Sequence, residues 1–196
     1  MSKRLFDVVA AGCGLILLAP VLLALALWIR LDSPGPALFR QRRVGRYGRH
    51  FDIYKFRTMA DRRDEGRQLT VGQDPRITRA GRFLRRTKLD ELPQLLNVLV
   101  GTMSLVGPRP EVPRYVDRYP PAVREAVLSV APGITDLAAI LYKDENDILG
   151  RAPDPERAYV ETILPVKLEY YQRYVRERSF WLDVRIICRT LAAILS

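Results

Sequence analysis

Histidine and cysteine are scarce in this chain. Its 196 residues include one histidine, His50, and two cysteines, Cys13 and Cys188, which stand near opposite ends of the sequence. A single histidine excludes a histidine-rich metal site and argues against a Ser–His catalytic pair. Two distant cysteines form neither a disulfide framework nor a metal-binding pattern, which suits a protein in a reducing compartment.

A glycine-rich phosphate-binding loop is also absent. The sequence contains neither a Walker A pattern nor a dinucleotide-binding fingerprint. A phosphorylated ligand would therefore be held by cationic side chains and a metal ion. Cationic side chains are plentiful, since 32 Lys and Arg against 22 Asp and Glu give a net charge of +10. This charge predicts a negatively charged partner such as nucleic acid, anionic lipid or a phosphorylated substrate.

One long stretch, residues 8–29, carries no charge at all. It is longer than the apolar core of a signal peptide, about 7–15 residues, and it reaches the roughly 20 residues that a membrane segment needs. Lys3 and Arg4 precede it, and Arg30 follows it directly. Because basic flanks favour the cytoplasmic side, two basic flanks favour a re-entrant helix that bends at Pro20. By charge alone, a straight span remains an equal alternative.

The remaining sequence predicts an α+β fold that is mostly helical. Residues 33–36, Ser-Pro-Gly-Pro, are a turn that ends the membrane segment, and a basic connection with two glycines predicts a short β-hairpin after it. For the last helix, an interfacial amphipathic helix and a docked core helix both fit. The expected elements are strands at 37–41 and 51–56, a polar helix or loop at 61–73, a helix at 115–130 broken at Pro120-Pro121, a helix at 154–178 interrupted at Pro165, and a helix at 179–195.

The segment 88–99 contains an adjacent pair of carboxylates, Asp90 and Glu91. The stretch just before them, residues 76–88, contains six basic residues and no acidic one. The spacing predicts a helix with Thr87 or Asp90 as its N-cap, which places both acids near the positive end of the helix dipole. By itself, this pair fits an ordinary helix start as well as a catalytic site. We expect two distinct faces on this helix: Leu92, Leu95, Leu96 and Leu99 on one, and Asp90, Gln94 and Asn97 on another.

Five motifs in a fixed order resemble the bacterial sugar transferases, which are small monotopic polyprenyl-phosphate phosphoglycosyl transferases. The resemblance covers nearly the whole chain. The motifs are Lys-Arg-x-Phe-Asp before the apolar run, Lys-Phe-Arg-Thr-Met at 55–59, Leu-Asp-Glu-Leu-Pro-Gln-Leu-x-Asn-Val-Leu at 89–99, Met-Ser-x-Val-Gly-Pro-Arg-Pro at 103–110, and Pro-Gly-Ile-Thr at 132–135.

The resemblance implies a reaction and the residues that carry it. A nucleotide-diphosphate sugar, usually a UDP-sugar, would give its sugar-1-phosphate to undecaprenyl phosphate and release UMP, with Mg²⁺ as cofactor. Asp90 would be the nucleophile of a covalent intermediate, with Glu91 as its partner and both acids as magnesium ligands. Lys55, Arg85 and Arg109 match positions near the phosphates, where charge spreads in the transition state. For Lys55 and Arg109, an ion pair with the carboxylates is compatible with that role.

The resemblance also implies a location in the cell. Residues 1–32 would form the re-entrant membrane helix, and residues 33–196 a catalytic domain with interfacial helices at the cytoplasmic face of the bacterial plasma membrane. No further membrane helix precedes residue 8 in this sequence, so we expect a minimal catalytic unit. The family breaks its membrane helix at a Ser-Pro pair, but this chain has Ala19-Pro20, so the bend rests on Pro20.

A second departure from the family follows residue 135. The family commonly continues with Gly-Trp-Ala-Gln, whereas this chain has Asp-Leu-Ala-Ala from Asp136 to Ala139. The resemblance therefore implies no particular sugar for this chain.

Three other classes of protein account for less of the sequence. A nucleic-acid-binding protein leaves the uncharged run unexplained, and a membrane scaffold leaves Asp90, Glu91 and Lys55 without a role. A glycosidase needs two carboxylates about 5–10 Å apart across a sugar, whereas adjacent acids project in different directions. We therefore expect a UDP-sugar, undecaprenyl phosphate and anionic lipid headgroups as partners, and no nucleic acid. The oligomeric state stays open, with a homodimer among the options.

Overall fold

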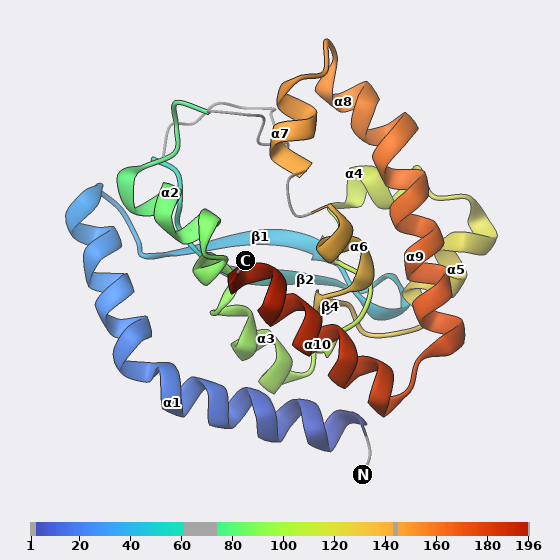
Figure 1. Cartoon of the computed structure of the whole chain (residues 1–196), viewed down its shortest axis with the longest axis horizontal. Coiled ribbons are helices and arrows are strands. Elements are labelled where there is room, and N and C mark those ends of the chain that lie inside the picture. Colours follow the sequence, from blue (N-terminus) through green and yellow to red (C-terminus); the bar gives the residue numbers. More distant parts are fainter. Residues whose placement is uncertain (1–2, 61–73, 143–144, 196) are drawn as a thin grey trace.

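The structure, a computed structural model, describes residues 3–60, 74–142 and 145–195 (Figure 1). The polar helix or loop predicted at 61–73 lies outside these residues. The described chain is mostly helical, as predicted. Its elements are α1 (Lys3–Asp32), β1 (Leu38–Val44), the 3₁₀ turn η1 (Arg46–Gly48), β2 (His50–Phe56), α2 (Arg79–Arg86), the 3₁₀ turn η2 (Leu89–Glu91), α3 (Gln94–Val100), β3 (Ser104–Val106), α4 (Pro113–Val116), α5 (Pro121–Leu128), β4 (Gly133–Thr135), α6 (Leu137–Leu141), α7 (Glu145–Gly150), α8 (Pro155–Ala158), the π-helical turn η3 (Tyr159–Ile163), α9 (Leu164–Glu177) and α10 (Phe180–Leu195).

Helix α1 contains the whole uncharged run and continues through Pro20 as one helix. Its ribbon bends between its two halves, as an internal proline allows because it removes one backbone hydrogen bond (Figure 1). Within the described residues, α1 is the one helix whose length and apolar composition would allow it to cross a membrane. Its middle is open, since Ile16 and Leu17 are each 79% exposed. The chain leaves α1 at the predicted turn of residues 33–36.

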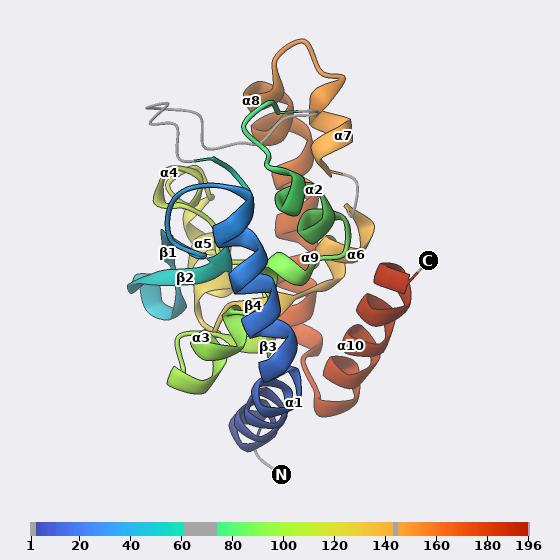
Figure 2. The same ribbon diagram turned by 90° about the vertical axis from the view of Figure 1, so that its left-hand side faces the viewer.

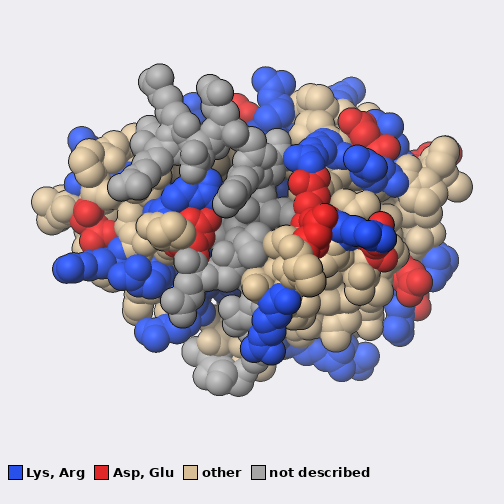
Figure 3. All heavy atoms as spheres, turned by 90° about the horizontal axis from the view of Figure 1, so that it is seen from above, with Lys and Arg blue, Asp and Glu red and all other residues tan. Residues whose placement is uncertain are grey.

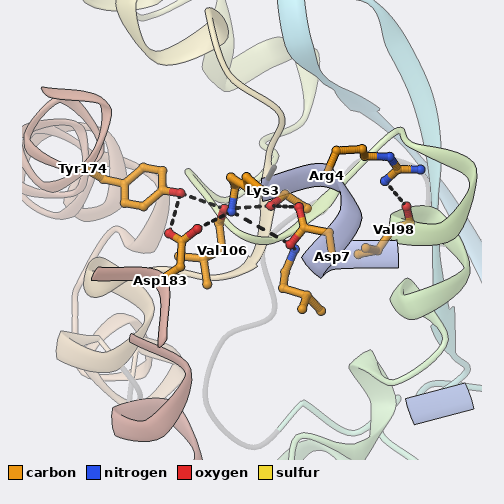
Figure 4. Close-up of polar contacts among 9 residues, drawn as sticks. Lys3, Arg4, Asp7, Val98, Val106, Tyr174 and Asp183 are labelled. Atoms are coloured by element: carbon orange, nitrogen blue, oxygen red, sulfur yellow. Dashed lines mark hydrogen bonds and ion pairs between the residues drawn. The ribbon is translucent and has the colours of Figure 1, made fainter. Parts of the chain in front are cut away.

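The N-terminal end of α1 is fixed to the domain by buried polar contacts (Figure 4). Lys3 Nζ lies 2.5 Å from Asp183 Oδ2 at the start of α10, and Asp7 Oδ2 accepts a 2.8 Å hydrogen bond from Ser104 Oγ in β3. The Tyr174 hydroxyl of α9 lies 2.9 Å from the other oxygen of Asp183. Arg4 donates to the carbonyl oxygen of Val98 in α3 at 2.5 Å. These contacts join four elements to the first turns of α1.

The C-terminal end of α1 is fixed by a buried arginine from the end of the hairpin. Arg57 donates to the carbonyl oxygen of Pro36 at 2.7 Å, and to the hydroxyl and carbonyl oxygens of Ser33 at 2.6 and 2.8 Å. Asp32 accepts a 3.0 Å hydrogen bond from the backbone N–H of Ala80 in α2. Both ends of α1 therefore dock on the same domain, and Figure 2 shows α1 in front of it, rising from the N-terminus to the level of α2.

Two strand pairs organise the backbone around the loops of the sequence motifs. The antiparallel hairpin β1–β2 pairs Leu38 with Phe56, which confirms the predicted hairpin with slightly longer strands. A parallel pair, β3–β4, aligns Ser104 with Gly133 and was not predicted. It needs glycine at position 133, because a Cβ there would lie 2.1 Å from the backbone nitrogen of Gly107. This close approach fixes the start of the loop that carries Arg109.

The C-terminal helices agree with the sequence in most respects. The predicted helix at 115–130 is broken into α4 and α5, and Asp154 caps α8 by accepting from Arg157 N at 3.0 Å. The interruption after α8 is the π turn η3, rather than a break at Pro165, which lies in the first turn of α9. Helix α10 docks through buried Ile186, while Trp181 on its other side is 77% exposed. It therefore combines a core face with an exposed apolar face.

Candidate active site

The carboxylate pair lies in a 3₁₀ turn, which corrects the predicted helix start. Asp90 and Glu91 belong to η2, between α2 and α3, and Thr87 ends α2 instead of capping a new helix. Lys88 has φ 56°, in the left-handed region, so the backbone reverses just before the pair. Pro93 precedes the first turn of α3. The tight turn sends the two neighbouring side chains into different surroundings.

Glu91 accepts contacts from two cations. Its Oε1 lies 2.9 Å from Lys55 Nζ at the end of β2, and Arg109 makes a two-pronged contact that includes a 3.3 Å hydrogen bond from Nη1 to Oε2. Burial alone would raise the pKa of Glu91, but the charges and hydrogen bonds of Arg109 and Lys55 bring that pKa well below its usual range. Glu91 is therefore an ionised anchor that holds both cations at the site.

Asp90 has the opposite electrostatic environment. It is 9% exposed, and burial together with the neighbouring charge of Glu91 raises its pKa above the usual value. The charges of Lys55, Arg85 and Lys88 act against this shift. A carboxylate that is desolvated but surrounded by cations is a stronger nucleophile than one in water, provided that it stays ionised.

Arg85 reaches the same cleft from α2. Its Nε donates to Thr58 Oγ1 at 2.9 Å, and burial lowers the pKa of its guanidinium, with the charge of Asp90 as the largest opposing influence. The structure thus brings together five of the predicted residues, Lys55, Arg85, Asp90, Glu91 and Arg109. Ala19 and Pro20 lie in the middle of α1, and the residues of α1 that line the cleft are Ala26 and Arg30.

The polar face of α3 is buried, contrary to what its leucines suggest. Asn97 accepts from the backbone N–H of Tyr54 at 2.9 Å and donates to the carbonyl oxygen of Asp52 at 2.8 Å, both in β2. Gln94 is buried as well, whereas Leu96 is 40% exposed. The reason is that Asn97 satisfies backbone groups along an edge of β2 that would otherwise be buried without partners. It thereby holds η2 against the strand that carries Lys55.

The carboxylates line an open cleft of about 2490 Å³. One end is basic and lies between the hairpin and α2. The other end is walled by α4, α6, α7, η3 and α9. Figure 1 shows α2 at one end of the hairpin and α4, α6, α7 and α9 toward its other end. The cations of the basic end are Lys55, Arg57, Arg76, Arg85, Arg86 and Lys88.

Sequence reasoning missed three charged residues of this region. Arg57 stands two positions after Lys55 in the same motif and fixes the exit of α1. Arg43 and Glu111 form an ion pair in the cleft wall, with 3.7 Å between Arg43 Nη1 and Glu111 Oε2. Glu111 also accepts a 2.6 Å hydrogen bond from the Tyr159 hydroxyl. The two cations of the motif at 55–59 were a signal for Arg57, whereas the Arg43–Glu111 pair joins positions that nothing in the sequence connects. Within the described residues, no group of three or more His, Cys, Asp and Glu side chains is arranged to hold a metal ion.

Comparison with known proteins places this site in a family. The family model described as "Bacterial sugar transferase" matches residues 1–196. The chain belongs to the bacterial sugar transferase family. It is 42% identical over 200 residues to the UDP-glucose:undecaprenyl-phosphate glucose-1-phosphate transferase of Caulobacter vibrioides, an alignment that covers 100% of this chain and 70% of the relative.

Longer relatives in the family are named for different sugars. The UDP-N-acetylgalactosamine-undecaprenyl-phosphate N-acetylgalactosaminephosphotransferase of Aeromonas hydrophila is 39% identical over 99% of this chain. The UDP-glucose:undecaprenyl-phosphate glucose-1-phosphate transferase of Escherichia coli is 39% identical over 97% of it. The chain spans 44% of the Aeromonas protein and 39% of the E. coli protein. Because the chain is equally similar to these two relatives, which are named for different sugars, the comparison with them does not indicate which sugar this chain uses.

Proposed function

We propose that this sugar transferase moves a sugar-1-phosphate from a UDP-sugar to undecaprenyl phosphate and releases UMP. The observation that carries the proposal is the contrast between two adjacent acids. Asp90 is buried and has a raised pKa, whereas Glu91 is ionised and forms ion pairs with Lys55 and Arg109. Two adjacent acids in opposite environments have separate roles, one reactive and one structural. The names of the relatives support the two substrates.

Asp90 performs the covalent step. A carboxylate oxygen of Asp90 attacks the sugar-proximal phosphorus of the donor, and the bond from that phosphorus to the bridging oxygen breaks, so that UMP leaves with the electron pair. An oxygen of undecaprenyl phosphate then attacks the same phosphorus and displaces Asp90 as a free carboxylate. Covalent catalysis divides one displacement into two, with UMP released before the lipid product.

Lys55 and Arg109 stabilise the charge that develops on the phosphoryl oxygens. Glu91 holds both side chains next to the reacting carboxylate of Asp90. These cations therefore need to move little when charge develops on the phosphoryl oxygens. Arg85 adds a third cation from α2. Glu91 therefore acts mainly by positioning.

Magnesium fits the chemistry of this donor set. The ion commonly uses one or two carboxylates and completes its shell with water and substrate phosphates, so Asp90 and Glu91 would suffice without a third acidic ligand. When bound, it would neutralise charge on the pyrophosphate of the donor. Glu91 would then share its oxygens between the ion and Arg109, with which it already makes two contacts.

The proposed location is the cytoplasmic face of the bacterial plasma membrane, with α1 as a re-entrant helix. Two facts support this. The two ends of α1 dock on one domain through Lys3, Asp7 and Asp32, and the middle of α1 exposes apolar side chains. A straight span would separate these ends by about 30 Å of hydrocarbon. Basic residues around both ends would lie against anionic headgroups.

The direct test is UMP release by the purified enzyme in detergent or nanodiscs. UDP-glucose, UDP-galactose, UDP-N-acetylglucosamine and UDP-N-acetylgalactosamine are each supplied with and without undecaprenyl phosphate, in Mg²⁺ or in EDTA. We expect Mg²⁺-dependent turnover with at least one donor, and without acceptor a single release of UMP in proportion to the enzyme. Absence of turnover with all four donors would contradict this assignment, and turnover undiminished in EDTA would remove the metal from it.

A further inference from the structure

The cleft continues beyond Arg109 into a part that the transfer of the phosphoryl group does not use. Its walls come from α4, α6, α7, η3 and α9, together with the segment that follows Arg109. Arg109 marks the boundary, because its charge acts both on Glu91 and on Tyr171 of α9. The residues of this part that enter the argument are Glu111, Tyr115, Glu145, Tyr159, Lys167 and Tyr171.

Apart from Asp136, the charged side chains named for this part form ion pairs with each other or with Arg43. Lys167 forms an ion pair with Glu145 and lies over the ring of Tyr159, and Arg43 pairs with Glu111 at 3.7 Å. The opposite end of the cleft holds an excess of cations instead. The phosphates of a donor are therefore drawn to the basic end, and the part beyond Arg109 suits an uncharged polar group.

Three buried polar atoms here have no hydrogen-bond partner within the described part of the chain. They are the hydroxyls of Tyr115 and Tyr171, and Oδ2 of Asp136. Tyr171 and Asp136 are each 1% exposed, and burial raises the pKa of the Tyr171 hydroxyl, which keeps it protonated as a donor. Asp136 uses its other oxygen to cap α6 at Ala139 N. Buried polar groups are normally paired, so a cluster of unpaired ones beside a cleft indicates a polar ligand.

We propose that this part of the cleft is the sugar subsite of the donor, where Tyr171 and Asp136 hydrogen-bond to the sugar hydroxyls. Phenol hydroxyls donate and accept, and carboxylate oxygens accept, so together they complement a polyhydroxylated ring. The rings of Tyr159 and Tyr171 are buried, so neither offers an exposed aromatic face on which uracil could stack. Since neighbouring side chains cover the unpaired atoms, the wall adjusts as the sugar enters. The inference rests on the proposed function and assigns one end of the same substrate.

This subsite contains a departure from the family pattern. Asp136 is the first residue after the motif at 132–135, and it lies between Thr135 and Ala139, which both line the cleft. If Asp136 contacts the sugar, this departure from the family pattern bears directly on which sugar is bound.

The test compares two tyrosines on the same helix. Tyr171→Phe removes a hydroxyl without a partner in the described chain, whereas Tyr174→Phe removes one within hydrogen-bonding distance of Asp183 and of the Val106 carbonyl oxygen. For Tyr171→Phe we expect an unchanged or higher melting temperature, about 10-fold lower kcat/KM for the best UDP-sugar, and weaker discrimination within the panel of four donors. For Tyr174→Phe we expect a lower melting temperature with kcat/KM and donor ranking unchanged.

Inhibition by UMP separates the sugar from the nucleotide. The inhibition constant of UMP should not change in Tyr171→Phe, because UMP lacks the sugar. Asp136→Asn keeps an oxygen to cap α6 and provides a second variant, with the same expected loss of discrimination. The inference is overturned if both variants keep wild-type kcat/KM and donor ranking. It is also overturned if the inhibition constant of UMP rises in Tyr171→Phe together with the KM of the UDP-sugar. Wild-type turnover in the same assay shows that such a result concerns the subsite and leaves the proposed function standing.

Discussion

Asp90 and Glu91 show how two neighbouring residues of similar chemistry divide their roles. Burial and the charge of Glu91 raise the pKa of Asp90, whereas Arg109 and Lys55 lower that of Glu91. The difference follows from the partners of each side chain: both carboxylates line the cleft, but within the described part of the chain only Glu91 makes ion pairs, with Lys55 and Arg109. At this scale the consequences can be measured with single substitutions.

Replacement of the two acids should separate catalysis from stability. Asp90→Asn should abolish UMP release and leave the melting temperature equal or higher, because it removes a buried charge. Glu91→Gln should leave trace activity and cost on the order of 3 kcal/mol of unfolding free energy, because it leaves Lys55 and Arg109 with one neutral partner. Mass spectrometry of the enzyme with donor alone should find the phosphosugar on Asp90, and an adduct on another residue would refute the assignment.

The two cations held by Glu91 should matter for the rate. Lys55→Ala and Arg109→Ala should each lower kcat/KM by on the order of 10²-fold or more, the effect of losing one transition-state donor. Arg173→Ala is the matched control, since Arg173 forms an exposed ion pair with Glu177 on α9 and should leave the kinetics unchanged. Near-normal kinetics in either test variant would reduce that cation to a structural partner of Glu91.

The pH profile should carry the signature of Asp90. Because its folded pKa is raised, the nucleophile protonates as pH falls through a value above the ordinary aspartate pKa of about 3.9, and kcat/KM falls with it. Stability behaves differently. Glu91 has a depressed folded pKa, so its contribution to stability is present above the unfolded glutamate pKa, about 4.3, and is lost only as pH falls toward the folded value.

Glu91→Gln provides the control for this profile. Loss of the Glu91 charge removes one of the two influences that raise the pKa of Asp90, so the acid limb of the residual activity should move to lower pH. An acid limb at the ordinary aspartate value in the wild type, or one that does not move in Glu91→Gln, would be inconsistent with these environments.

Helix α1 is the element that would connect the site to a membrane under the proposed function. Its first turns bind β3, α3 and α10, and its last turns bind the hairpin exit and α2. Helix α2 carries Arg85, and β3 leads into the Arg109 loop, so the two docking regions adjoin the two sides of the cleft. Helix α1 is thus tied at both ends to elements that carry the candidate site.

The bend at Pro20 should determine how α1 meets the bilayer. Pro20→Leu restores a backbone hydrogen bond at the centre of the helix and should shift α1 toward a straight span. The assay replaces Cys13 and Cys188, introduces Ser2→Cys, and treats intact cells with a membrane-impermeant maleimide. We expect labelling only in the Pro20→Leu background. Labelling in the background that retains Pro20 would exclude the re-entrant topology, and a cytoplasmic cysteine at an exposed position such as Arg173 should stay unlabelled in both.

At the scale of the whole molecule, apolar surface and positive charge are distributed differently. The largest exposed apolar side chains lie on α1 and α10, including Ile16, Leu17 and Trp181. On the face that carries α2, α7 and α8, Lys and Arg side chains are interspersed with acidic ones (Figure 3). Attachment to a membrane should therefore depend on apolar contact more than on the net charge of +10.

A membrane wash distinguishes these two kinds of attachment. Membranes that contain the protein should retain it in about 1 M salt, where the Debye length is about 3 Å and surface electrostatics are screened, and should release it only in detergent. A peripheral protein bound by charge would be released by salt. Replacement of Ile16 and Leu17 by serine should weaken retention, whereas replacement of Arg173 and Glu177, which are exposed on α9, should have no effect.

The sequence by itself determined the kinds of groups and the local elements of this protein. An uncharged run of residues 8–29 predicts a long apolar helix, and short apolar strands around a connection with two glycines predict the hairpin, and the structure has both. The motifs identified Asp90, Glu91, Lys55, Arg85 and Arg109 as one site, and the structure gathers them in one cleft. Such features depend on short spacings and on residue chemistry, which a single chain displays directly.

Only the tertiary structure decided how those groups pair. The partners of Glu91 come from positions 55 and 109, and the choice of Glu91 over Asp90 depends on the backbone at Lys88, whose positive φ the sequence does not reveal. Asn97 faces inward because a strand edge needs its hydrogen bonds, which overrides the leucine pattern of α3. Tyr171 in the cleft wall and Asp136, whose neighbours Thr135 and Ala139 line the cleft, likewise come from segments 35 residues apart, so their shared hydrogen-bonding capacity exists only once the chain has folded.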